Sequence, residues 1–530
     1  PYDRFVRDQV AGDLDGNRDG IIATGMLAIG NWGGGDADKE KLLTDIADDQ
    51  IDVVSRAFMG LTVSCARCHD HKFDPFTQKE FYQLYSYFNN VPEKGRAVKF
   101  GNSPPLIKAP TREQQKKLAE LDTKLKDSEA QWAKMQPEVA KAEAKWSKEV
   151  KASELRNWMP IRGLVKRASG GAPRAGEAPL TFDGSGLSWG DVGDFGYDHR
   201  FTLAAWVNPT RPTGAILWRG PDEPQAEGYA VELVTGKVRV SLTKRWLDDA
   251  LRVETAAAVK TDAWTHLAVT YDGSRSAAGV KVYVNGAEAK TTVLLDELNQ
   301  TFENKGPLLI GAGGGKANRL TGSMDEIRVY KRVIDRDEIA ALAEPRPLAE
   351  LVNDLGDDSP AATRARVRLF FLEIAGPPEI RNQFTSLRAL REERAQFWDS
   401  VPTTMVMEEL PKPRDAFVLI RGEYDKRGEK VTAAVPAALP SLAKELPNNR
   451  LGLARWLVSP ANPLTARVAV NRAWQLHFGK GLVRTGEDFG TQGEHPSHPA
   501  LLDYLAVEFA KDWDMKRLHK LIVTSATYRQ

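Results

Sequence analysis

The spacing of apolar residues changes twice along this 530-residue chain. Up to about residue 158, and again beyond residue 349, apolar side chains recur mostly at helical spacing. Between these limits, Phe201–Val207, Tyr229–Val234 and His266–Tyr271 have the pattern of short strands separated by turn residues. Asn285-Gly286 is typical of a two-residue hairpin turn. Successive strands without intervening helices favour an antiparallel sandwich. We therefore predict a multidomain α+β protein, a mainly helical body with an inserted antiparallel β-sandwich (jelly roll).

The helical parts divide further by composition. From residue 109 to 157 the chain is rich in Ala, Glu, Lys and Gln, and Pro137 interrupts the helical spacing. This pattern predicts a spacer arm made of a helical hairpin, with two long antiparallel helices. The predicted domains are a helical domain at 1–108, the hairpin at 109–157, the sandwich at 175–345, a helical and short-strand connector at 349–446, and a helical C-terminal domain at 447–530.

Overall charge and hydrophobicity exclude several classes of partner. The 73 basic and 72 acidic side chains nearly cancel, which argues against nucleic acid or an anionic membrane surface as the partner. No apolar run reaches transmembrane length. The chain begins at Pro1 inside a helical pattern, so we expect a fragment whose signal sequence lies outside it. The glycines at 30, 33, 34 and 35 lack the Lys-Ser/Thr of a phosphate-binding loop and do not indicate nucleotide binding.

Both cysteines of the chain lie in one motif, Cys65-Ala66-Arg67-Cys68-His69. Cys-x-x-Cys-His is the pattern of covalent c-type haem attachment, in which the two thiols join the haem and the histidine ligates iron. Two alternatives stay open. Cys65 and Cys68 can form a disulfide or a redox dithiol, or they can bind zinc together with His71 and a further ligand. Helical spacing before the motif and a capping box at Thr77–Glu80 after it place the motif in a loop between two helices.

Two long runs of residues resemble a known family. The run 57–75, which reads AFMGLTVSCARCHDHKFDP, is similar to the cytochrome-c-associated surface proteins of planctomycetes. Residues 447–456, 471–474, 477–483, 487–490, 496–499 and 524–530 resemble the second of the two paired domains of unknown function in that family. The resemblance implies an extracytoplasmic protein of the periplasm or cell surface that carries haem c on Cys65 and Cys68, with His69 as proximal ligand, and that has a redox partner protein. It also implies that residues 1–108 pack against 400–530.

The predicted sandwich resembles the laminin-G-like, concanavalin-A-like lectin fold. The resemblance rests on runs such as Trp264–Gly273, Tyr283–Gly286 and Gly322–Tyr330. It implies a polysaccharide or cell-surface glycan as partner, sometimes bound with calcium. The candidate residues are Trp218, Tyr229 and Trp246 for stacking on sugar rings, and Asp183 and Asp325 for calcium. The alternatives are that these aromatic residues belong to the core and that these aspartates cap turns.

A low-spin haem iron needs a sixth ligand, and the family resemblance places several His and Met residues near the first domain. The candidates are His477, His495, His498, Met405 and Met407. Each can instead be an ordinary core or hydrogen-bonded side chain. On the helix before the motif, Asp45, Asp48, Asp49 and Asp52 are expected to form a solvated face, with a cation site as the alternative.

Three functions follow from these patterns. The leading hypothesis is an exported c-type haem protein that couples electron transfer to glycan binding through the lectin-like domain. The first alternative is a non-redox carbohydrate-binding or structural scaffold with a Cys65–Cys68 disulfide. The second is a glycan-active enzyme, a hydrolase or an oxidoreductase, with acid and base residues drawn from Asp70, Asp74, Glu487 and Asp488. The sequence does not decide whether the chain is an enzyme.

Overall fold

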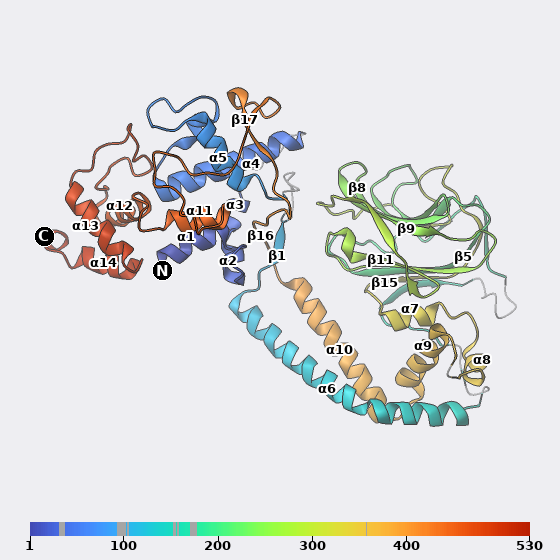
Figure 1. The fold of residues 1–530 in the computed structure, drawn as a ribbon. Helices are drawn as coiled ribbons and strands as arrows, with labels where there is room; N and C mark the ends of the chain where they lie inside the picture. The colour runs from blue at the N-terminus through green and yellow to red at the C-terminus, as the bar shows by residue number, and fades with distance from the viewer. Residues whose placement is uncertain are drawn as a thin grey trace. The chain divides into compact units, whose positions relative to one another are not determined.

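The computed structural model describes residues 1–30, 38–92, 102, 105–151, 155, 158–169, 178–356 and 358–530. The chain forms two compact units (Figure 1). Unit 1 combines Pro1–Ala109 with Pro402–Gln530, and unit 2 is Pro110–Val401. The glycines at 33, 34 and 35 lie outside the described residues. Within the described ranges, no helix has both the length and the apolar character needed to cross a bilayer.

Unit 1 is built from helices at both ends of the chain. The helices are α1 (Tyr2–Ala11), α2 (Arg18–Ala23), α3 (Gly25–Ala28), α4 (Lys39–Val54), α5 (Gln78–Phe88), α11 (Arg450–Leu457), α12 (Thr465–Phe478), α13 (Pro499–Ala510), α14 (Met515–Val523) and α15 (Ala526–Arg529). One buried cluster contains Phe58 and Phe81 from the first block together with Leu453 and Trp456 from the last. The predicted packing of residues 1–108 against 400–530 is therefore confirmed.

The two blocks of unit 1 are also joined by a short antiparallel ladder. Strand β1 (Leu106–Lys108) pairs with β16 (Thr403–Met405), and the Ala109 N–H donates to the Pro402 carbonyl at 2.7 Å. The chain therefore leaves unit 1 and returns to it at adjacent positions. A second strand pair, β17 (Ala416–Leu419) and β18 (Arg427–Val431), packs against α5.

Unit 2 contains the predicted sandwich of two antiparallel sheets. Within the described residues, one sheet has the order β12-β11-β10-β5-β15-β2, with β3 also paired to β15, and the other has the order β13-β9-β8-β7-β6-β14-β4. The strands are β2 (Leu164–Ala168), β3 (Leu180–Asp183), β4 (Leu187–Ser188), β5 (Phe201–Pro209), β6 (Gly214–Arg219), β7 (Gly228–Val234), β8 (Lys237–Arg245), β9 (Asp249–Ala258), β10 (Thr265–Tyr271), β11 (Val280–Val284), β12 (Ala287–Glu288), β13 (Thr291–Asp296), β14 (Leu308–Ile310) and β15 (Thr321–Tyr330). The positive φ angles of Asn285 (50°) and Gly286 (83°) form the predicted hairpin turn. The first strand, β2, precedes the expected start at residue 175.

The helical arm differs from the predicted hairpin within 109–157. Helix α6 (Arg112–Glu149) is continuous, with Pro137 inside it, and its antiparallel partner is α10 (Pro378–Ser400), as Figure 1 shows. Trp132 packs on Phe384, and Arg394 donates to Asp122 at 2.9 Å. A proline removes one helical hydrogen bond, but Val139, just beyond it, is fully buried in a cluster with residues of the 371–380 segment. This packing holds the helix together on both sides of Pro137.

Three shorter helices complete unit 2: α7 (Arg336–Leu342), α8 (Leu348–Asn353) and α9 (Ala361–Phe370). Helix α7 covers the outer face of the sheet that contains β5 and β10, where Ile339 and Leu342 pack on Ala204 and Ala268. The segment 349–446, expected to be one connector, is divided between unit 2 and unit 1 at residue 401. The outer face of the other sheet is not part of the main core, and its side chains are described below.

Candidate functional site

The Cys-x-x-Cys-His motif lies on a short turn between α4 and α5, as predicted. Helix α4 runs into a π-helical turn, Ser55–Met59, which ends at Gly60 with a φ of 62°. A 3-10 turn, Val63–Arg67, then carries the first cysteine, and the predicted capping box of Thr77 and Glu80 begins α5. Cys65 and Cys68 are free, exposed thiols, and His69 is also exposed. The reactive side chains of the motif therefore face solvent.

Arg67, between the two cysteines, anchors the motif to α4. Its guanidinium donates to Asp48 at 2.7 Å and to Asp45 at 2.9 Å. The Ser64 hydroxyl also donates to Asp52 at 2.7 Å. Burial raises the pKa of Asp48, and the Arg67 charge and hydrogen bond oppose that rise.

The expectation that this acidic row is a solvated face is thus wrong for Asp45, Asp48 and Asp52. Their spacing of three and four residues places them on one helix face, and that face is turned toward the motif. The signal that could have identified this contact was the presence of a single arginine inside a motif that follows an acidic helix face. Gln78 and Tyr82 of α5 complete the anchor, because each donates to the Arg67 carbonyl at 2.9 Å.

The ring of His69 has one nitrogen engaged. Its Nδ1 lies 2.7 Å from the Asp70 carbonyl, which can only accept a hydrogen bond, so Nδ1 carries the proton. In the neutral ring this leaves the lone pair on Nε2. A metal-binding histidine commonly donates its second N–H to a carbonyl in this way. Two exposed thiols and an imidazole in this tautomer fit covalent haem attachment, with Nε2 as the iron ligand.

His71 is held differently. The Asp74 N–H donates to His71 Nδ1 at 2.8 Å, so the proton of the neutral ring is on Nε2, and both side chains are almost completely buried. Asp74 in turn accepts from the N–H (2.6 Å) and hydroxyl (2.8 Å) of Thr491. Throughout the described part of the chain, no three His, Cys, Asp or Glu side chains are arranged to hold a metal ion. The structure therefore does not assemble the zinc site of Cys65, Cys68 and His71.

The C-terminal block packs directly against the turn that precedes the motif. The Phe489 N–H donates to the Gly60 carbonyl at 2.7 Å, and a Cβ at Gly60 would lie 2.8 Å from the Phe489 ring. Arg472 donates to the carbonyl of Arg56 at 2.9 Å and to that of Ala57. These contacts satisfy carbonyls at the end of the α4 segment, which would otherwise lack a partner.

Three of the four proposed acid and base residues act as local hydrogen-bond acceptors. Asp70 accepts from the N–H of Gln78, the first residue of α5, at 2.8 Å, while Asp488 accepts from the Gly490 N–H at 2.9 Å. Asp74 binds Thr491 as described, and Glu487 is exposed. The structure brings Asp74 close to the 488–491 loop. The carboxylates of Asp74 and Asp488 both accept hydrogen bonds from this loop and hold it in place. This arrangement does not favour a paired-carboxylate enzyme.

The candidate sixth ligands occupy varied positions in unit 1. Met407 is buried, and the Gln50 amide lies 3.5 Å from its sulfur. His477 Nε2 lies 2.8 Å from His519 Nδ1, at the contact of α12 with α14. His498 Nδ1 lies 3.1 Å from the Ser497 hydroxyl, His495 is exposed, and Met405 lies in β16. The identity of a sixth ligand stays a prediction.

In unit 2, two of the three candidate sugar-stacking residues belong to the interior. Tyr229 is in the main core, and its hydroxyl donates to Gly193 at 2.8 Å. Trp218 is buried and donates to the Pro221 carbonyl at 2.9 Å. Trp246 is half-buried, and the Arg252 guanidinium lies 3.4 Å from the centre of its ring. Only Trp246 of the three therefore presents surface to a ligand.

The two candidate calcium ligands do not share a site. Asp183 accepts from both the N–H (3.0 Å) and the hydroxyl (2.7 Å) of Ser185, which is the turn-capping role. Asp325 is fully buried, and the Ser169 hydroxyl donates to it at 3.1 Å. Calcium binding stays a prediction without an assembled set of carboxylates.

The outer face of the β13–β4 sheet carries polar residues that the sequence analysis missed. Val240, Leu251 and Val253 point into the core, so the alternating residues Ser241 and Arg252 point outward, and these two are directly opposite across β8 and β9. The Ser241 hydroxyl and Arg252 Nε are buried and, among the described residues, have no hydrogen-bond partner. A buried polar atom without a partner is uncommon in folded proteins. We call the half-exposed surface formed by Trp246 and Arg252 the open face.

Comparison with known proteins identifies three parts of the chain. Residues 1–93 match a family described as a protein of unknown function (DUF1549), and residues 449–530 match another (DUF1553). Residues 183–340 match the concanavalin A-like lectin/glucanases superfamily. The first and last matches contain the Cys-x-x-Cys-His motif and the block that packs against it.

Solved structures are similar over about a third of the chain. The binding domain of Paraclostridial Mosquitocidal Protein 1 has 14% identity and a TM-score of 0.26, over 34% of this chain and 52% of that one, so the match spans about half of that protein's length. The CBM40 domain of Ruminococcus gnavus IT-sialidase, bound to α2,3-sialyllactose, has 16% identity and a TM-score of 0.27. The match covers 34% of this chain and 99% of that domain. A pentraxin from Limulus polyphemus has 16% identity and a TM-score of 0.23, and the match covers 35% of this chain and 84% of the pentraxin chain. By the family matches, the chain combines the paired domains DUF1549 and DUF1553 with a concanavalin-A-like domain between them, the arrangement that the family resemblance implied.

Proposed function

We propose that this chain is an exported c-type haem protein that binds a polysaccharide or cell-surface glycan through its lectin-like domain. The observation that supports haem attachment is the presentation of Cys65, Cys68 and the Nε2 of His69 on one exposed turn. A bound haem would supply one-electron redox chemistry. Arg67 would keep the turn fixed to α4 during the reaction with a partner, through its two carboxylate contacts.

Haem attachment is tested by expression through a secretion route with c-type haem maturation. The purified chain is expected to gain the mass of one haem and to show sharp bands in a reduced-minus-oxidised visible spectrum. Cys65→Ser/Cys68→Ser should lose both signals, because the thiols form the covalent bonds. Lys72→Ala, which removes an exposed neighbour outside the site, is the matched control and should keep both. A colourless wild-type chain lighter only by the two hydrogens of a disulfide would instead support the scaffold alternative.

The observation that supports glycan binding is the open face. Trp246 and Arg252 form a stacked, half-exposed pair, and the Arg252 guanidinium carries N–H donors. A flat aromatic surface next to hydrogen-bond donors suits a sugar ring, which has apolar faces and oxygen acceptors at its edges. The superfamily that residues 183–340 match includes lectins by its description. The opposite sheet is less suitable, because α7 covers its outer face.

Glycan binding is tested with a glycan array followed by titration of the best ligand. Trp246→Ala is expected to weaken binding about tenfold or more, since loss of an aromatic anchor costs on the order of 1–2 kcal/mol. Leu247→Ala is the matched control, because Leu247 is the adjacent residue and is 83% exposed. Equal losses in both variants, or an array without any bound glycan in the presence and absence of calcium, would contradict the proposal.

A further inference from the structure

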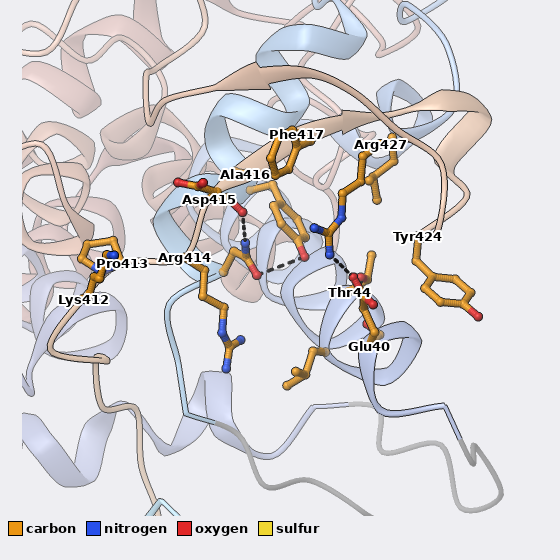
Figure 2. A pocket seen from close by; sticks show the side chains of 14 residues that line it. Glu40, Thr44, Lys412, Pro413, Arg414, Asp415, Ala416, Phe417, Tyr424 and Arg427 are labelled. Carbon is orange, nitrogen blue, oxygen red and sulfur yellow. Dashed lines mark hydrogen bonds and ion pairs between the residues drawn. The ribbon is translucent and has the colours of Figure 1, made fainter.

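Unit 1 contains a pocket that is separate from the Cys-x-x-Cys-His motif. Its volume is about 650 Å³, and it lies between α4, α5 and the segment 412–427 (Figure 2). Pockets of a few hundred to 1,000 Å³ are typical of small-molecule sites. Phe417 and Leu43 supply apolar wall, and Thr44, Tyr85 and Asn89 supply polar groups. The composition is that of a ligand site: apolar walls with a few polar groups.

The charged side chains that line the pocket do not all have partners. Arg427 pairs with Glu40, and Asp415 lies 2.7 Å from Lys430. Lys412 and Arg414 also line the pocket, but among the described residues neither has a hydrogen bond or an ion pair. The lining side chains thus carry three positive and two negative charges, an excess of one, and both carboxylates already have a cation as partner.

Arg414 is the more informative of these two cations because it is half-buried. Removing a guanidinium from water without a compensating anion is unfavourable, whereas an anion at its edge, where the N–H donors point, restores the lost interactions. The Tyr85 hydroxyl, which also lines the pocket, is close enough to Arg414 to interact with its charge. Burial raises the pKa of Tyr85, so its hydroxyl stays protonated at neutral pH, bonded to Asn89 at 3.3 Å.

We infer that this pocket binds a small organic anion whose acidic group contacts Arg414 and Lys412 and whose organic part lies against the wall that includes Phe417. A carboxylate or sulfate group matches the guanidinium in charge and in shape. An inorganic ion would fill only a small part of 650 Å³ and would leave the apolar wall in water. The ligand class is therefore an acidic sugar or an aromatic acid rather than free sulfate or phosphate.

The experiment is calorimetric titration of the full chain at constant ionic strength with four probes: glucuronate, benzoate, glucose and inorganic sulfate. We expect saturable binding of glucuronate or benzoate and at least tenfold weaker binding of glucose and sulfate. Glucuronate and glucose differ in the carboxylate alone, so their comparison isolates the acidic group. Preference between glucuronate and benzoate distinguishes a sugar acid from an aromatic acid.

Arg414→Gln should weaken binding at least tenfold, because a charge-assisted bidentate contact is lost. Lys426→Gln is the matched control: it removes one positive charge from the same segment, but Lys426 pairs with Glu423 and does not line the pocket, so binding should change less than twofold. Both variants should melt at the wild-type temperature, since Arg414 has no partner to lose. Trp246→Ala should also bind the probe normally, which separates this result from the glycan proposal.

Four results would overturn the inference. The first three are the absence of binding for all four probes, binding of sulfate as tight as that of the organic acids, and equal losses in Arg414→Gln and Lys426→Gln. The second would mean a simple oxyanion site, and the third would mean general attraction by positive charge. A lower melting temperature for Arg414→Gln with unchanged binding would equally assign Arg414 a structural role and contradict its contact with the ligand.

Discussion

Arg450→Ala is expected to lower the free energy of unfolding of unit 1 by about 3–5 kcal/mol, because it leaves buried carboxylates without their partner. The side chain of Arg450 is fully buried. It donates to the Val10 carbonyl at 3.0 Å and to both oxygens of Asp13, and its Nε lies 3.2 Å from Glu409. One residue at the start of α11 thus holds the end of α1 and the segment after β16 together.

Hydrogen exchange measured by mass spectrometry reports this loss separately for unit 1 and unit 2. Exchange in α1 and α11 should accelerate strongly in Arg450→Ala, and exchange in the sandwich should not change. Arg455→Ala is the matched control on the same helix, because its side chain is 41% exposed and lies 3.6 Å from Asp15, so its effect should stay within about 0.5 kcal/mol. Similar effects of the two variants would show that the buried contacts of Arg450 are not needed for stability.

Glu338→Gln is expected to destabilise unit 2 by about 3 kcal/mol at pH 7. The carboxylate of Glu338 is almost completely buried, and Arg332 donates to it at 2.6 and 2.8 Å. Arg388 from α10 also pairs with it, and the Asp335 N–H donates at 3.1 Å. Burial alone would raise its pKa, but the Arg332 hydrogen bonds and the charges of Arg388 and Arg332 lower the pKa from the usual 4.5 to about 2. This difference between the pKa of Glu338 in the folded chain and its usual value corresponds to about 3 kcal/mol of stability.

The pH dependence follows from the sign of this shift. A carboxyl with a lowered pKa in the folded chain contributes its full stability above about pH 4.5 and loses it as the pH falls toward about 2. The wild-type sandwich should therefore lose stability over this window, and Glu338→Gln should show a flatter curve. Asp337→Asn, an exposed change on the same helix, is the control. The measurement is calorimetric unfolding at several pH values. If the stability of wild type and of Glu338→Gln depended on pH in the same way, the lowered pKa of Glu338 would be contradicted.

Local signals predicted the elements whose structure depends on nearby residues. The Asn285-Gly286 turn and the capping box of Thr77 and Glu80 were predicted because both need only a few adjacent side chains. The hairpin at Pro137 failed because a distant segment, around Phe371, buries the helix on the far side of the proline. A contact made across more than two hundred residues leaves no trace in the local spacing of apolar side chains.

The same limit applies to the candidate sites. The position of the motif in a loop was predictable, but the role of Arg67 was not, because an acidic helix face has the same pattern whether it meets solvent or a guanidinium. Tyr229 and Trp246 are both aromatic residues at strands or turns, yet the first is in the core and the second is half-exposed. Tyr229 lies in β7, where a register shift of one residue would reverse the face that its side chain meets, whereas Trp246 lies in the turn between β8 and β9. The pocket at Arg414 depends on three segments that are distant in sequence.

The ladder between β1 and β16 has a consequence for the order of folding. Bringing these two strands together in an unfolded chain requires closing a loop that contains all of unit 2, and the entropic cost of closure rises with loop length. Pairing of α6 with α10 brings the two ends of that loop near one another, since Asp122 meets Arg394 close to them. Unit 2 therefore lowers the cost of completing unit 1 when it folds first. Until residues 402–530 are available, the core that Phe58 and Phe81 share with Leu453 and Trp456 stays incomplete.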